Sequence, residues 1–124
     1  MMTNISYRTI QSANSQINIV FSLVQETTFV SDLYNKLRNE LLQELVFTQD
    51  YTTTYLNVDY RLNNEEADDL RRRSLILLHY ADYINDMAIK GDDNGSNSKR
   101  LEYALRALCL TLDTSAMCLR RLDY

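Results

Sequence analysis

The stretch NNEEADDLRRRSLILLHYADYINDMAIKG, residues 63–91, has the start, the repeat and the end of one long helix. Asn63 and Glu66 have the spacing of a capping box, in which both side chains bond free backbone N–H groups of the first turn. Gly91 follows Lys90 where a helix is expected to end. Small and apolar residues recur between these ends at alternating steps of three and four: Ala67, Leu70, Ser74, Leu77, Ala81, Ile84 and Ala88. This spacing places them on one face, and we predict a central helix with the other helices packed around it.

The composition favours long helices in one domain that spans residues 1–124. The 124 residues include no proline and only two glycines, while 45% of them are hydrophobic and 24% are charged. Proline-free, glycine-poor chains suit uninterrupted helices and not turn-rich β-sandwiches. The net charge of −4 disfavours non-specific binding to nucleic acid or to an anionic membrane, and it suits a basic protein partner.

Three further segments have a helical repeat, at about 4–26, at about 29–48, and from Ser98 to the C-terminal region. Their stripes comprise Ile10, Ala13, Ile17, Val20, Phe21 and Val24; Val30, Leu33, Leu37, Leu41 and Leu45; and Leu101, Ala104, Leu105, Leu108, Leu112, Ala116, Leu119 and Leu122. Thr27 and Thr28 offer an N-cap for the second of these helices. No glycine or proline separates the first two segments, so they are either two helices or one bent rod. The whole pattern predicts an all-α, four-helix-bundle-like single domain.

The segment near residues 50–62 differs in kind from the rest of the chain. Its threonines and tyrosines favour extended backbone, and Leu56, Val58, Tyr60 and Leu62 alternate with polar residues. It is an extended arm laid across the helices, an edge that pairs with a second copy, or a poor helical turn. We favour the arm.

Cysteine usage and the N-terminus indicate a cytoplasmic protein. Cys109 and Cys118 are nine residues apart, which is about 180° on one helix, so they cannot bridge each other there. The chain has no apolar run of about 20 residues and no secretory signal at its start. With a single histidine and no metal-binding spacing of cysteines or acids, we expect neither a metal ion nor a cofactor.

His79, the only histidine, lies opposite the buried stripe of its helix. Glu65, Arg72 and Asp86 precede and follow it at seven-residue intervals, so the four form a polar line whose simplest interpretation is a solvated face. Six residues separate Arg72 from His79, and this spacing is similar to the Arg–His motif of HEPN-type ribonucleases. That resemblance implies general acid–base catalysis by His79, stabilisation of phosphate charge by Arg72, and a cleft completed by dimerisation.

The arginine run 71–73 is not expected to bind nucleic acid. Three consecutive residues fan over about 200° of a helix, so they do not form one patch. Acidic residues lie one turn away, at Glu66, Asp68 and Asp69, and pairing within the helix explains the run better.

The run Leu75-Ile76-Leu77-Leu78 is apolar around the whole helix. Only Leu77 belongs to the core stripe, so the arm, a second chain or another protein must cover the remaining residues. We predict a tyrosine-rich contact face made of Leu75, Ile76, Leu78, Tyr83, Tyr55 and Tyr60. The expected function is a non-enzymatic protein–protein interaction module, and we expect a homodimer. A small adaptor, a secretion chaperone and a toxin-neutralising inhibitor of the immunity type all fit.

Overall fold

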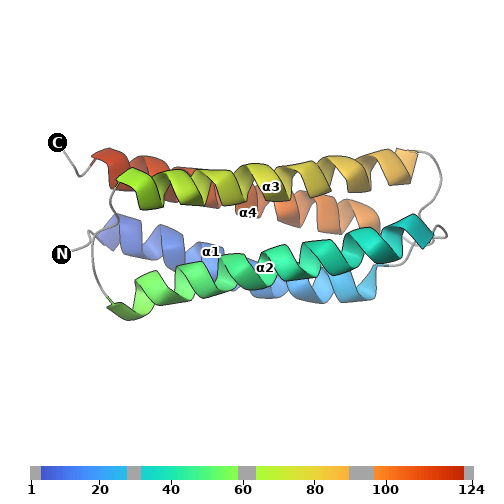
Figure 1. The fold of residues 1–124 in the computed structure, drawn as a ribbon, viewed down its shortest axis with the longest axis horizontal. Helices are drawn as coiled ribbons and strands as arrows, with labels where there is room; N and C mark the ends of the chain where they lie inside the picture. The colour runs from blue at the N-terminus through green and yellow to red at the C-terminus, as the bar shows by residue number, and fades with distance from the viewer. Residues whose placement is uncertain (1–3, 28–31, 59–63, 90–96, 122–124) are drawn as a thin grey trace.

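The chain forms four long α-helices in the computed structural model, which describes residues 4–27, 32–58, 64–89 and 97–121. They are α1 (Asn4–Glu26), α2 (Asp32–Val58), α3 (Asn64–Ile89) and α4 (Asn97–Arg121). Successive helices run in opposite directions, and the start of α1 lies at the same end of the bundle as the end of α4 (Figure 1). The all-α bundle predicted from the repeats is confirmed.

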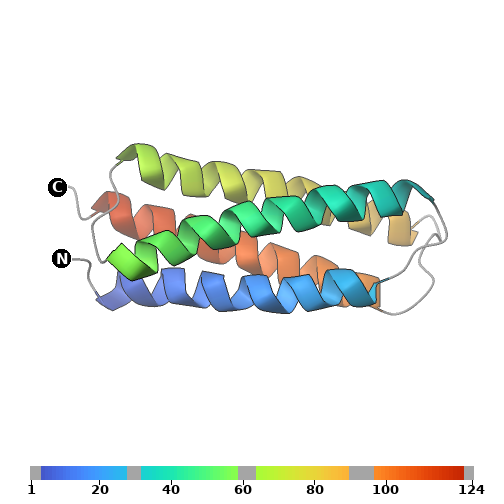
Figure 2. The same ribbon diagram turned by 60° about the horizontal axis from the view of Figure 1, so that its bottom comes forward.

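The helices surround one core, and each helix packs against two neighbours. α4 packs against α3 and α1, α1 also packs against α2, and α2 has its second contact with α3 (Figure 2). The contact between α2 and α3 is the slimmest of the four. α3 is therefore one corner of a four-sided bundle, and the prediction of a central helix with the others around it was wrong. A helix at the centre would bury its whole circumference, whereas α3 buries one stripe.

The predicted stripes form the core. Their buried members are Ile10, Ala13, Ile17, Val20 and Val24 in α1, Leu37, Leu41 and Leu45 in α2, Ala67, Leu70, Ser74, Leu77, Ala81 and Ile84 in α3, and Leu101, Leu105, Leu108, Leu112 and Ala116 in α4. The predicted stripe residues Val30, Leu33, Ala88, Leu119 and Leu122 have side chains outside the described part of the chain, and so do the capping residues Asn63 and Glu66.

The extended segment predicted near residues 50–62 is wrong as far as the structure describes it, because α2 continues to Val58. The hydroxyls of Thr48 and Thr54 donate to the carbonyls four residues earlier, at 2.8 Å each. Thr48, Thr52 and Tyr55 are buried and continue the stripe of Leu45 at steps of three and four. Tertiary burial of these residues outweighs their weak helix propensity. Residues 59–62, Tyr60 among them, lie outside the described part.

The end of α1 shows that α1 and α2 are separate helices. The backbone N–H and the hydroxyl of Thr27 both donate to the Leu23 carbonyl, at 3.0 and 2.6 Å, and Thr27 is buried. This side chain therefore satisfies a free carbonyl of the last turn of α1. The N-cap that we predicted for Thr27 at the start of α2 was wrong, and Thr28 lies outside the described residues.

Candidate functional site

A groove follows the line where α2 and α3 meet, and it is here called the α2–α3 groove. It consists of two adjoining hollows of about 660 and 380 Å³, and Ile76 lines both. The first is lined by Phe47, Asp50, Tyr51, Thr54 and Tyr55 of α2 and by Asp69, Arg72, Arg73 and Ile76 of α3. The second is lined by Lys36, Leu37 and Glu40 of α2 and by Ile76, His79, Tyr80, Tyr83 and Met87 of α3.

Long polar side chains bridge the two helices along this groove. The Tyr51 hydroxyl donates to the Asp69 carboxylate at 2.7 Å, and the Arg73 guanidinium pairs with Glu44. The Arg73 guanidinium also lies 5.9 Å from the centre of the Phe47 ring, within the range of a cation–π contact. These side chains span the slimmest of the four helix contacts of the bundle.

Large apolar side chains are exposed between these bridges. Phe47 has 47% and Tyr83 has 56% of its surface exposed, and Ile76 between them is half-buried. Buried Tyr55 lies beneath the first hollow, where its ring meets that of Tyr51 edge to face at 4.9 Å. Apolar side chains that stay exposed beside a concave surface are typical of binding sites.

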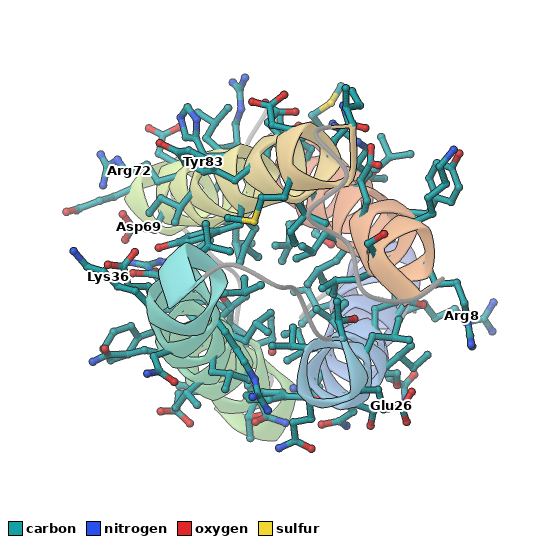
Figure 3. The ribbon with its side chains drawn as sticks, turned by 90° about the vertical axis from the view of Figure 1, so that its right-hand side faces the viewer. Arg8, Glu26, Lys36, Asp69, Arg72 and Tyr83 are labelled. Atoms are coloured by element: carbon teal, nitrogen blue, oxygen red, sulfur yellow. The ribbon has the colours of Figure 1, made fainter. Side chains whose placement is uncertain are left out.

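Charged groups line both sides of the groove. Figure 3 shows Lys36 of α2 and Asp69 and Arg72 of α3 on the same side of the bundle, where these two helices adjoin. Arg72 pairs with Asp69. Burial, followed by the nearby Glu40 carboxylate, raises the pKa of Tyr80. The Tyr80 hydroxyl donates to the Glu40 carboxylate at 3.5 Å.

The structure divides the six residues of the predicted contact face. Ile76 and Tyr83 lie together in the groove, but Leu78 lies about 160° from Ile76 around α3 and packs against the core. Leu75 is 56% exposed and lies on the side of α3 that adjoins α4. Tyr55 is only 3% exposed and lines the first hollow from below, and it lies on helix α2 rather than on the extended arm that we predicted. Tyr60 lies outside the described residues.

Sequence reasoning missed much of the groove. Phe47, Tyr51, Tyr80 and Met87 line it but were absent from the predicted face. One signal was present, because Phe47 and Tyr51 are four residues apart and stand directly beside the buried positions Thr48 and Thr52. Large aromatic residues at the margin of a core stripe indicate a half-covered helix face.

Arg72 and His79 are both exposed on the outer side of α3, together with Glu65 and Asp86. The polar line is thereby confirmed. Arg72 lines the first hollow and His79 the second, so neither hollow holds both side chains, and Arg72 pairs with Asp69. The ribonuclease assignment stays a prediction from the Arg–His spacing.

The arginine run is paired mainly between helices. Arg71 pairs with Asp113 of α4 at 3.9 Å and Arg73 with Glu44 of α2. Arg72 pairs with Asp69 within α3. The prediction of intrahelical pairing for the whole run was wrong, because the fan of three side chains reaches both neighbouring helices.

Cys109 is a buried free thiol in α4. Burial, with a smaller contribution from the nearby Asp113 carboxylate, raises its pKa to about 12. A thiol of this kind stays protonated and is a poor nucleophile. The side chain of Cys118 lies outside the described part of the chain.

Within the described ranges, none of the helices combines the length and hydropathy needed to cross a membrane. Among the same residues, no three His, Cys, Asp or Glu side chains gather in a way that could hold a metal ion. Comparison of the chain with protein-family models, curated proteins and solved structures finds no match.

Proposed function

We propose that the protein is a non-enzymatic interaction module that binds an amphipathic helix of a partner protein in the α2–α3 groove. The observation that carries the proposal is the apolar line Phe47–Ile76–Tyr83, which continues from one hollow to the next. Helices that bind in grooves use a stripe of apolar anchors, with polar residues on the opposite face.

The length of the groove suits a helix. Its lining on α3 extends from Asp69 to Met87, which corresponds to about 27 Å at 1.5 Å per residue. A partner helix of about five turns would cover this length. A small molecule would fill only one of the two hollows, so the continuity of the surface favours a peptide.

The charges favour a partner with basic flanks. Glu40 and Asp50 of α2 are exposed and line the groove, while the charge of Arg72 is offset by Asp69. Lys36 adds one cation at the end of the groove. Together with the net charge of −4, this excess of exposed acids would speed the encounter with a basic partner.

Such a module would serve as an adaptor, a chaperone or an inhibitor of the immunity type. Each of these works by covering a helix or a surface of another protein and needs no chemistry of its own. The buried reduced thiol of Cys109 suits the reducing cytoplasm, where we place the protein.

The test is affinity capture from the source cells with three baits: the wild-type protein, Ile76→Asp, and a matched control, Ile19→Asp. Ile19 is an exposed isoleucine of α1, so its substitution adds the same charge away from the groove. We expect a protein captured by the wild type and by Ile19→Asp but lost with Ile76→Asp. Equal capture by all three baits would refute the proposal.

Half-buried Ile76 also contributes to packing, so a second bait separates lost binding from lost folding. Tyr83→Asp changes an exposed side chain of the same groove and should leave the thermal midpoint within about 2 °C. It should also lose the captured protein. Hydrogen exchange on the purified complex should then show new protection in α2 and α3, and protection confined to α1 would contradict the site.

A further inference from the structure

The face formed by α3 and α4 has an alternating charge pattern around an apolar centre. Arg71 of α3 pairs with Asp113 of α4 at 3.9 Å, and Asp82 of α3 pairs with Arg106 of α4 at 2.8 Å. Along α3 the order is therefore cation then anion, and at the same levels α4 presents anion then cation. All four side chains are more than a third exposed.

Leu75 and Leu110 lie between these two ion pairs. They are 56% and 68% exposed, and they stand level with each other because Ser74, one residue before Leu75, donates to the carbonyl of Cys109, one residue before Leu110. Tyr103 and Met117 are also exposed and repeat the position of Leu110 at seven-residue intervals. α4 thus has an exposed apolar line whose middle stands level with Leu75 of α3, and Leu110 on that line also borders a hollow lined by Arg8, Thr9, Ser12 and Gln16 of α1.

We infer that this α3–α4 face is a homodimer interface, in which α3 of each chain packs against α4 of a second copy around a twofold axis parallel to the bundle. A second copy of the chain is the expected partner, because the charges of this face would meet opposite charges on the same face of another copy. This rotation places Arg71 opposite Asp113 of the other copy, and Asp82 opposite its Arg106. Each leucine then meets the other leucine of the second copy, so the contact is isologous, as in most homodimers.

Two more exposed residues would also face an opposite charge across this twofold axis. Asp86 follows Asp82 by one turn of α3, and Lys99 precedes Arg106 by two turns of α4. Asp86 lies in the last turn of α3 and Lys99 in the first turn of α4. The same axis brings Asp86 towards Lys99 of the other copy, whereas an axis perpendicular to the helices would bring each of them to the opposite end.

The face is large enough for a stable contact. A standard interface buries roughly 800 Å² per partner, which is about a ninth of the 7200 Å² exposed by this chain. One side of a four-sided bundle offers more than that. The ion pairs within each chain do not have to break when the dimer forms. Asp113 has spare acceptor capacity, because its contact with Arg71 is 3.9 Å long. Arg106 donates to Glu102 through Nε and to Asp82 through Nη2, which leaves Nη1 for the second copy.

Sedimentation equilibrium of the purified protein tests the interface. We expect a mass of twice the 14.5 kDa chain at roughly 100 µM, and association weakened roughly thirtyfold or more by Leu110→Arg at the centre of the face. Ile19→Arg, at a similarly exposed position of α1, should leave the dimer unchanged. A wild-type protein that is monomeric at this concentration overturns the inference, and so does a Leu110→Arg variant that dimerises like wild type.

A mixing experiment tests the orientation. In the Arg71→Asp variant, the new aspartate would face Asp113 of the other copy, and the two acids would repel. In the Asp113→Arg variant, the new arginine would face Arg71 of the other copy, and the two bases would repel. Each variant should therefore dimerise more weakly than wild type. In a mixture of the two variants, the aspartate introduced at position 71 of one chain would face the arginine introduced at position 113 of the other. The second contact of that heterodimer would be the wild-type pair.

We therefore expect heterodimers from the mixture, detected by native mass spectrometry with one chain isotopically labelled, and more dimer than either variant forms alone. A perpendicular axis predicts no such recovery, because it pairs α3 with α3 and α4 with α4. Failure to recover dimer by mixing would thus overturn the α3-to-α4 arrangement. Both variants change exposed residues, and circular dichroism should confirm that both are folded.

Discussion

Truncation of Tyr55 to alanine should cost the fold about 4 kcal/mol. Tyr55 is 3% exposed and belongs to the core cluster. An aromatic side chain of this kind buries about 150–250 Å², and loss of roughly 120 Å² of it at 25 cal/mol per Å² amounts to about 3 kcal/mol. The cavity and the lost edge-to-face contact with Tyr51 add about 1 kcal/mol.

Urea unfolding followed by circular dichroism measures this change as a difference in the free energy of unfolding. The matched control is Tyr83→Ala, which removes the same atoms at a position that is 56% exposed and should cost about 0.5 kcal/mol. Tyr55→Phe keeps the ring and should recover more than half of the loss. A Tyr55→Ala protein that loses less than about 1 kcal/mol with an unchanged m-value would refute the burial of the end of α2, because an extended arm on the surface predicts such a small effect.

Single side chains of the core, the groove and the polar line give three more tests. In a Cys118→Ser background, a disulfide reagent should label Cys109 only when the protein transiently unfolds and exposes this thiol. The reason is that burial raises the pKa of Cys109 to about 12 and lowers its thiolate fraction roughly a thousandfold. Its contribution to stability, measured against Cys109→Ala, should be constant below about pH 9 and decline as pH rises towards 12, whereas fast labelling of the native state would contradict this burial. A double-mutant cycle of Arg73→Met and Glu44→Gln should show a coupling of about 1 kcal/mol, since both side chains are mostly buried, and zero coupling would show that the bridge contributes nothing. His79→Ala should change the stability by less than about 0.5 kcal/mol, and an RNA cleavage activity that this substitution abolishes would establish the ribonuclease alternative over the interaction module.

The core was predictable from sequence because a buried stripe requires an apolar or small residue on every turn of the helix. Leu70, Leu77 and Ile84 of α3 recur every seven residues and are all fully buried. The same spacing holds in α4, where Leu101, Leu108 and Ser115 are buried. The repeat depends only on the geometry of one helix, so it can be recognised without knowing what the helix packs against.

The end of α2 was not predictable in the same way, because its core positions hold residues with extended preference. Thr48, Thr52 and Tyr55 fill the places of leucines, while Leu56 and Val58 alternate with polar residues. The buried Thr52 hydroxyl accepts a bond from the Asn14 amide of α1 at 2.9 Å. That contact spans 38 residues, and local propensity contains no information about it.

The groove was only half predictable for a related reason. Ile76 and Tyr83 stood out because they are apolar and lie off the stripe of their own helix. Their grouping with Phe47 and Tyr51 depends on which helix becomes the neighbour of α3 on that side. Leu75 is apolar and off the stripe like Ile76, but it lies on the side of α3 that adjoins α4, and its own sequence does not distinguish the two sides.

The dimer interface and the groove together determine how many partner helices one dimer would bind. The α3–α4 face and the α2–α3 groove lie on adjacent sides of the bundle, and a twofold axis along the bundle turns the second groove to the opposite side of the dimer. One continuous partner helix cannot reach both grooves. If both proposals hold, isothermal titration of the dimer with a partner peptide should therefore give one peptide per chain, with equal and independent sites, and the monomeric Leu110→Arg variant should bind it with the same affinity. A stoichiometry of one peptide per dimer would show instead that the two copies build a single site.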